Sequence, residues 1–307
     1  MTTPERSRSL GSDRPHEPVL VGEVLSLLAP RPDGVYLDAT LGFGGHTRAL
    51  IGAGAGRVIG IDRDADALAM ARTELSDLGT RVTLVHADYR SIGAVAAMHA
   101  AAGADGVLAD LGVSSMQLDD PARGFSFRQA GPLDMRMDRS SGPTLADRLD
   151  AVAEADLADV IFTFGEERHS RRVARAIVAA RDRGELTDTG ALAAVVRRAA
   201  GGGRGWQRID PATRTFQALR IWVNGELDGL AGFIDAAFAA LGAGGRLAMI
   251  AFHSGEDRIV KHTFRRLAED GTRARLLTKR PMEADDDECA RNPRARSARL
   301  RGLEKVA

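Results

Sequence analysis

The stretch VYLDATLGFGGHT at residues 35–47 decides the fold of this chain. It begins with an apolar run typical of a buried strand, continues into a glycine-rich turn and ends where a helix is expected. Glycines at 42, 44 and 45 permit positive φ and remove the Cβ, so the backbone can approach a ligand closely. The turn has no Gly-Lys pair and does not match G-x-G-x-x-G. It therefore predicts neither a P-loop nor a dinucleotide fingerprint.

Further strand-like runs follow this stretch at intervals of about 25 residues, with alanine-rich helical patterns between them. They lie at 57–61, 82–85 and 106–109, and a late run at 245–252 predicts one more buried strand. Such alternation indicates βαβ units, in which helices cover a parallel sheet.

The middle of the chain has a different composition. Residues 121–138 are rich in Gly, Pro and Met, and residues 145–200 have helical patterns with few β-branched runs. We therefore expect an α/β domain with a Rossmann-like fold, interrupted by an inserted helical domain. The expected divisions are a flexible tail at 1–15, the Rossmann-like domain at 16–120 and 216–300, the insertion at 121–215, and a C-terminal end at 301–307.

The composition of the chain excludes several classes of protein. The 307 residues include 42 basic and 42 acidic side chains, so a wholly basic nucleic-acid binder is excluded, although a local basic surface is not. Apolar stretches are too short for a membrane span, and the polar N-terminus does not match a secretory signal. The single cysteine, Cys289, cannot form an internal disulfide and fits a reducing compartment. These features predict a cytoplasmic protein.

Acidic residues follow four successive predicted strands: Asp38, Asp62, Asp88 and Asp110. One aspartate in this position is more often a helix cap, but four beside a glycine-rich turn favour a ligand at the sheet edge. A carboxylate at Asp38 would repel a pyrophosphate and attract an ammonium group, and Asp62 is placed to accept ribose hydroxyls. A ligand with an amino-acid end, a ribose and a positive centre is S-adenosylmethionine.

The sequence resembles the bacterial small-subunit ribosomal RNA methyltransferase H family, also called MraW, over nearly all of residues 16–301. The motifs that carry the resemblance are HEPVL (16–20), DATLGFGGHT (38–47), IDRD (61–64), DLGVSSMQLDD (110–120), RGFSF (123–127), LDMRM (133–137), FGEER (164–168), PATRTFQALRI (211–221), FHSGEDR (252–258) and NPRARSA (292–298). Several of them are peculiar to the family. Family members usually have His at position 210 and Leu at 255, where this chain has Asp and Gly.

The resemblance implies methyl transfer from S-adenosylmethionine to the exocyclic N4 of a cytidine in small-subunit (16S) ribosomal RNA, near the decoding site. The partner it implies is that RNA, which we expect in an assembled 30S subunit although the sequence leaves free RNA open, and no metal is expected. The cofactor contacts it implies are Gly44, Gly45, His46, Asp62, Tyr89, Asp110 and Gln117, to which the strand-end pattern adds Asp38.

Two residues are candidates for catalysis. Many amino-methyltransferases place an Asn or Asp followed by two prolines at the end of the fourth strand, and this chain has Asp110 there without the prolines. Asp110 is expected to contact the cofactor, the cytosine amine or both. His253 follows the late strand and is either a base or phosphate contact or an ordinary loop residue.

Arginines suggest where RNA is bound. Arg168, Arg171, Arg172 and Arg175 follow helical spacing, which predicts one face that is either solvated or a phosphate surface. Arg294 and Arg296 belong to a C-terminal arginine run, interpreted as a solubilising tail or an RNA contact. Trp206 is either a base-stacking residue or an anchor of its loop.

Two other functions compete with RNA methylation. A Rossmann-like pattern alone is compatible with a nicotinamide-dependent oxidoreductase, which the glycine spacing and Asp38 oppose. A non-catalytic RNA-binding assembly factor is opposed by the complete set of cofactor acids. The sequence leaves the oligomeric state open.

Overall fold

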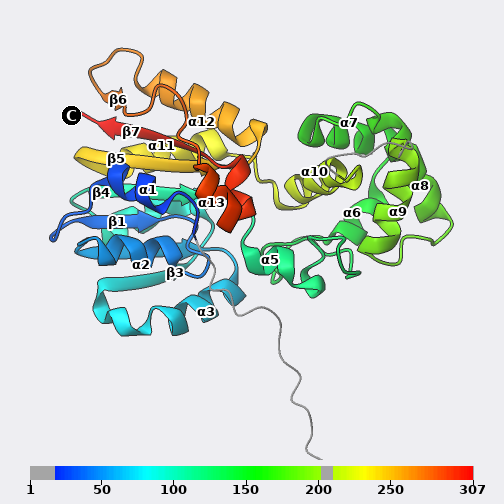
Figure 1. Cartoon of the computed structure of the whole chain (residues 1–307), viewed down its shortest axis with the longest axis horizontal. Helices are drawn as coiled ribbons and strands as arrows, with labels where there is room; N and C mark the ends of the chain where they lie inside the picture. The colour runs from blue at the N-terminus through cyan, green and yellow to red at the C-terminus, as the bar shows by residue number, and fades with distance from the viewer. Residues whose placement is uncertain (1–17, 202–209, 307) are drawn as a thin grey trace, which may run out of the picture.

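A computed structural model describes residues 18–201 and 210–306. The tail expected at 1–15 and Trp206 lie outside the described residues. Within them the chain forms a sheet domain and a helical lobe, joined by two connections (Figure 1).

Seven strands of the described chain form one sheet in the order β3-β2-β1-β4-β5-β7-β6. The first five pair in parallel, and β7 runs antiparallel to both β5 and β6. This order places β1 and β4 side by side at the centre, where the direction of winding reverses and α/β proteins bind ligands. The strands are β1 (Val35–Asp38), β2 (Arg57–Asp62), β3 (Val82–His86), β4 (Ala104–Asp110), β5 (Leu241–Ala251), β6 (Ala274–Leu276) and β7 (Arg299–Lys305).

Helices cover both faces of the sheet because successive strand side chains alternate between two cores. Tyr36 packs toward one core with residues of α1 and α2, whereas Leu37 packs toward the other with residues of α4, α11 and α12. The helices of this domain are α1 (Val21–Leu28), α2 (Gly45–Gly52), α3 (Ala65–Glu74), α4 (Ile92–His99), α11 (Leu230–Ala240), α12 (Ser254–Leu267) and α13 (Asp286–Arg291). The predicted Rossmann-like α/β fold is confirmed.

The helical lobe has a separate buried core. It consists of α6 (Leu145–Ala151), α7 (Glu154–Gly165), α8 (Ser170–Asp182), α9 (Thr189–Ala200) and α10 (Ala212–Asn224). Phe216, Leu219 and Val223 of α10 are buried in that core. The sequence boundary at 216 therefore falls inside α10, and the helical packing extends to Asn224. The reason is that the apolar stripe of α10 faces α7, and the chain turns only at Gly225, where φ is +56°.

The chain reaches the lobe through α5 (Ser115–Asp119) and a short 3-10 turn, Pro121–Arg123. Arg123 is only 2% exposed, and its Nη2 donates to Asp64 Oδ2 at 2.8 Å and to the Met137 carbonyl at 2.8 Å. Gln117 Nε2 donates to the same Asp64 oxygen at 2.8 Å. The connection is therefore fixed to the sheet domain by a buried ionic network.

The C-terminal segment corrects the expectation of an end at 301–307 and of an arginine-rich tail. Arg301 lies in β7 and its guanidinium donates to Asp257 at 2.7 and 3.1 Å, while Arg299 lies 3.4 Å from Asp257. Leu300 and Leu303 are fully buried. The sequence pattern did not predict this strand because charged residues interrupt its apolar ones. The strand forms because its backbone pairs with β5 on one side and β6 on the other.

No helix among the described residues combines the length and apolar character needed to cross a lipid bilayer.

Candidate active site

The glycine-rich turn between β1 and α2 has the backbone geometry that the sequence predicts. Gly42 and Gly44 have φ of +53° and +83°. Gly42 lines a cleft, and its amide donates to Asp62 Oδ2 at 2.8 Å. Gly44 is outside the cleft lining, and a Cβ there would lie 2.4 Å from Leu75. The missing Cβ of Gly44 thus permits close packing against Leu75, whereas Gly45, at the start of α2, lines the cleft.

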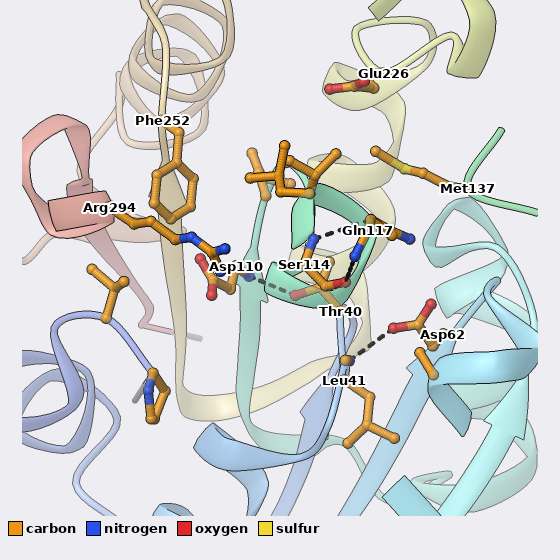
Figure 2. A pocket seen from close by; sticks show the side chains of 18 of the residues that line it. Thr40, Leu41, Asp62, Asp110, Ser114, Gln117, Met137, Glu226, Phe252 and Arg294 are labelled. Carbon is orange, nitrogen blue, oxygen red and sulfur yellow. Dashed lines mark hydrogen bonds between the residues drawn. The ribbon is translucent and has the colours of Figure 1, made fainter. Parts of the chain in front are cut away.

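The cleft has a volume of about 330 Å³ and lies at the carboxyl ends of the parallel strands (Figure 2). One wall comes from the turns after β1, β2 and β4, and the other from α10, the loop after it and the turn after β5. We call these the sheet wall and the far wall. The predicted site residues that line the cleft are Gly45, His46, Asp62, Tyr89, Asp110, Gln117, His253 and Arg294.

Asp62 is held on the sheet wall by backbone groups alone. It accepts from the amides of Gly42 and Asp64, each at 2.8 Å. Burial raises the pKa of Asp62 to about 6, because these hydrogen bonds only partly offset desolvation. No cationic side chain among the described residues forms an ion pair with it. Asp62 is thus an acidic acceptor placed to receive hydroxyl groups.

Asp110 occupies the centre of the cleft, at the end of β4 (Figure 2). Its amide donates to Thr40 Oγ1 at 2.6 Å, which fixes the backbone. Its Oδ2 lies 3.6 Å from His46 Nε2, and its Oδ1 is buried with no hydrogen-bond partner among the described residues. An unpartnered buried carboxylate oxygen is costly, and a ligand N–H is the group that would satisfy it.

His46 lies between two carboxylates beneath the cleft. Burial acts to lower the pKa of His46, but Asp110 and Asp38 raise it above its ordinary value. Among the described residues, neither ring nitrogen of His46 has a hydrogen-bond partner. The imidazole thus lies between the two carboxylates with both nitrogens free to bond.

Asp38 does not line the cleft. It is 1% exposed, accepts from Thr47 Oγ1 at 2.8 Å, and burial raises its pKa. Its carboxylate supports the start of α2 instead of facing a ligand ammonium directly. Asp38 lies at the sheet edge that the strand pattern predicts, but its side chain is directed into the protein, which a strand pattern does not show.

Tyr89 and Gln117 line the cleft at its two sides. Tyr89 donates from its hydroxyl to the carbonyl of Glu226 at 3.1 Å, and burial raises its pKa to about 12. Gln117 lies in α5 and closes a capping box with Ser114. Asp88, counted among the four strand-end acids, is outside the cleft lining and pairs with Arg90 at 2.7 Å.

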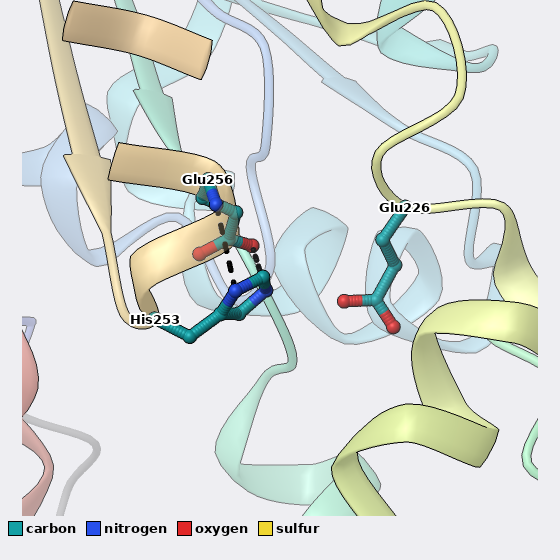
Figure 3. Close-up of side chains that lie close together, drawn as sticks. All are labelled: Glu226, His253 and Glu256. Carbon is teal, nitrogen blue, oxygen red and sulfur yellow. Dashed lines mark hydrogen bonds and ion pairs between the residues drawn. The ribbon is translucent and has the colours of Figure 1, made fainter. Parts of the chain in front are cut away.

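The far wall holds four polar side chains, three of which the sequence did not predict. Arg220 donates to both carboxylate oxygens of Glu226, at 2.9 and 2.8 Å. His253 caps α12, with its Nε2 3.3 Å from Glu256 Oε1 (Figure 3). Only His253 was predicted. Asp257 was noted beside it in the sequence, but it pairs with Arg301 on β7.

Comparisons with known proteins identify the family. Residues 13–306 match the model of the MraW methylase family. The chain is 53% identical over 291 residues to the ribosomal RNA small subunit methyltransferase H of Sorangium cellulosum, covering 95% of this chain and 91% of the relative. It is 50% identical to the protein of that name from Rhodopseudomonas palustris strain TIE-1, covering 96% and 92%. This chain belongs to the MraW methylase family.

Solved structures with a similar fold include a putative rRNA methylase from Clostridium thermocellum, with a TM-score of 0.45 at 13% identity over 94% of this chain and 98% of that one. Another is a putative methyltransferase from Streptococcus mutans in complex with SAH, with a TM-score of 0.44 at 13% identity, covering 93% and 97%.

As a member of this methylase family, the chain is an S-adenosylmethionine-dependent methyltransferase, which confirms the predicted cofactor and removes the oxidoreductase alternative. The sheet wall fits that cofactor chemically. Asp62 has no cationic partner and can accept ribose hydroxyls, while Asp110 presents an unsatisfied oxygen near the glycine turn. A sulfonium and an ammonium group are cations, and this wall supplies acids for them.

The predicted RNA-binding arginines are divided between two places. Arg168 lies in the turn before α8 rather than on the helix, and Arg171, Arg172 and Arg175 are exposed on α8. Arg175 pairs with Glu154 at 3.2 Å, so this arginine is not free for a phosphate. Helix α8 lies on the side of the lobe away from the sheet domain (Figure 1).

Arg294 and Arg296 lie close to the cleft instead. Both are in a short 3-10 helix, Pro293–Ser297, after α13. Arg294 lines the cleft, extends toward Asp110 in Figure 2 and donates to Asp119 at 3.1 Å. Arg296 is exposed.

Proposed function

We propose that this protein methylates the exocyclic N4 of a cytidine in small-subunit ribosomal RNA, near the decoding site, with the assembled small subunit in the cytoplasm as its substrate. The names of relatives about 50% identical over nearly the whole chain support ribosomal RNA as the substrate class. The structural observation that carries the proposal is the buried, unpartnered Oδ1 of Asp110 at the centre of the cleft.

Bound S-adenosylmethionine supplies a methyl group already activated by its positive sulfur, and the C–S electron pair returns to sulfur as the new C–N bond forms. The protein therefore mainly aligns donor and acceptor. Cytosine N4 is a poor nucleophile because its lone pair is conjugated with the ring. A hydrogen bond from N4–H to Asp110 Oδ1 would turn that lone pair toward the methyl group. Asp110 then takes the proton that N4 loses.

The residues around Asp110 suit this task. Thr40 holds the Asp110 backbone, and the imidazole of His46 lies 3.6 Å from Oδ2, the oxygen that does not face the amine in this scheme. The imidazole beside Oδ2 thus holds the carboxylate so that Oδ1 is the oxygen left to meet the amine. Arg294, at the mouth of the same cleft, is placed to hold a phosphate of the entering RNA.

Mass spectrometry of RNA tests the proposal directly. Small subunits that lack the modification are incubated with the protein and isotopically labelled methyl donor, and the nucleosides are then separated. We expect one labelled N4-methylated cytidine near the decoding site, and faster labelling of assembled subunits than of free RNA. Label at another base or atom would refute the assignment, and RNA binding without any label would indicate a non-catalytic assembly factor.

A further inference from the structure

The far-wall cluster of Arg220, Glu226, His253 and Glu256 is not used by the methyl-transfer scheme. Resting on the proposed function, we propose that His253 Nε2–H and the Glu226 carboxylate recognise the N3 and N4 edge of the target cytosine. The pair would make this site specific for an amino-pyrimidine over uracil.

Hydrogen bonding fixes the tautomer of His253. As the cap of α12, the ring accepts at Nδ1 from the amide of Glu256, at 3.4 Å. A neutral imidazole that accepts at Nδ1 carries its proton at Nε2. That Nε2 is buried, and the side chain as a whole is 9% exposed. Glu256 Oε1 lies 3.3 Å from Nε2 but forms no hydrogen bond with it, and no other described residue does. His253 can therefore offer this donor to a base at the cleft wall.

Glu226 offers the complementary acceptor. Its carboxylate extends toward His253 across the gap in Figure 3, and their polar atoms lie within 4.8 Å of one another. Arg220 donates to both of its oxygens, as an arginine does to a carboxylate, and a carboxylate only accepts hydrogen bonds. A donor and an acceptor thus lie side by side, and both residues line the cleft.

The same residues have the composition of a metal site, but the arrangement opposes one. A histidine nitrogen that carries a proton cannot ligate a metal, and freeing it would require the cap hydrogen bond to break. The guanidinium of Arg220 adds positive charge next to Glu226, which repels a cation. A neutral base edge meets neither obstacle.

The pattern matches cytosine and not uracil. Cytosine presents an acceptor at N3 beside donors on N4, so N3 can accept from His253 while N4–H donates to Glu226. Uracil presents a donor at N3 beside an acceptor at O4, which places like groups against each other. A site built to hydrogen-bond one edge strongly rejects the other, because its buried polar groups are left unpaired.

Glu256 acts as a positioning residue for His253. Its Oε2 accepts from the Phe252 amide at 2.9 Å, and its Oε1 lies 3.3 Å from His253 Nε2. Burial acts to raise the pKa of Glu256, but His253 and Arg220 lower it below its usual range. The ionised carboxylate keeps the imidazole directed along the wall.

A cycle that combines a protein variant with a single-atom change in the RNA tests the N3 contact. Small subunits carry cytidine or 3-deazacytidine, which lacks the N3 acceptor, at the target position. For the wild type, we expect 3-deazacytidine to lower kcat/KM roughly 10- to 100-fold, as removal of one partner from a buried hydrogen bond does. His253→Ala should cause a similar reduction on cytidine and little further reduction on 3-deazacytidine. If the reductions in kcat/KM caused by His253→Ala and by 3-deazacytidine multiply when the two changes are combined, the proposed hydrogen bond is wrong.

Controls separate this inference from the proposed function. His262→Ala removes an exposed histidine of the same helix and should behave as wild type on both substrates. Calorimetry with S-adenosylmethionine confirms that each variant is folded, and His253→Phe replaces His253→Ala if the latter no longer binds the donor. Glu226→Gln should lower kcat/KM on cytidine by a similar factor, and an unchanged value would refute the acceptor role. If the wild type forms no N4-methylcytidine, the proposed function fails. If it does form that product, but the reductions in kcat/KM from His253→Ala and from 3-deazacytidine multiply, only this inference fails.

Discussion

The two walls of the cleft bury acidic groups in opposite ways. On the sheet wall, Asp62 is held by two backbone amides without a cationic partner, and burial raises its pKa to about 6. On the far wall, Glu226 is paired with Arg220, and Glu256 has a lowered pKa because His253 and Arg220 oppose the effect of burial. Desolvation acts on both walls, so the difference comes from the cations that the protein supplies.

This difference indicates what each wall receives. Acids without a protein cation on the sheet wall remain available to the ribose hydroxyls and positive charge of a methyl donor. Acids already paired with an arginine of the protein need no further cation and can accept hydrogen bonds from a base. Changing one wall at a time should therefore separate donor binding from base recognition.

The largest effect on turnover is expected at Asp110, where the methyl donor and the cytosine amine meet in the proposed reaction. Asp110→Asn keeps the shape of the side chain but removes its ability to take a proton from N4. We expect kcat to fall about 10²- to 10⁴-fold, the usual contribution of a positioned proton acceptor. Single-turnover kinetics on small subunits measure the methyl-transfer step, and calorimetry with S-adenosylmethionine measures donor affinity.

Donor affinity of Asp110→Asn should stay within several-fold of wild type. A near-normal rate would contradict the role given to Asp110. If donor affinity falls greatly but the methyl-transfer rate at saturating donor is normal, Asp110 binds only the cofactor and does not act on the cytosine amine.

The second effect concerns the connection that holds the two walls together. Arg123→Ala leaves Asp64 buried at 3% exposure without its guanidinium partner. Breaking a buried ion pair in this way lowers the free energy of unfolding by about 3–5 kcal/mol. Urea denaturation followed by circular dichroism measures it, with Arg72→Ala, an exposed arginine of α3, as the control. A decrease below about 1 kcal/mol would show that the connection tolerates disruption.

The same contrast explains how much of the site the sequence could predict. The glycine turn, Asp62 and Asp110 were predicted because strand-turn-helix patterns place local residues at the sheet edge. Arg220 and Glu226 were missed because they lie in and just after α10, which packs with the helical lobe. No short-range pattern shows that the end of this helix lies at the cleft. Glu256 lies one residue from Asp257, and only tertiary pairing with β7 shows which of the two faces inward.

The third effect is a pH dependence of donor affinity, which we expect because Asp62 on the sheet wall has no cationic partner among the described residues. With a pKa of about 6, Asp62 is mostly protonated at pH 5 and ionised at pH 7. Ionised Asp62 accepts two ribose hydroxyls, so donor affinity should rise about tenfold between pH 5 and pH 7. Calorimetry at several pH values measures this, and Asp62→Asn should bind weakly with no pH dependence over that range. A wild-type affinity independent of pH would show that Asp62 is not the titrating group.

The smallest effect concerns the arginines farthest from both walls. Arg168, Arg171 and Arg172 are exposed, and α8 lies on the side of the lobe away from the cleft. If each meets one phosphate, replacing all three by alanine should lower RNA affinity several-fold and reduce the slope of log K against log salt by about 0.7–0.9 for each phosphate that is no longer neutralised. Filter binding at several salt concentrations measures this, with Arg72→Ala as the control. Donor affinity should not change, because charges on an exposed face are screened over about 10 Å. An unchanged salt slope would make this face a solvated one, and RNA binding would then be confined to the cleft mouth near Arg294.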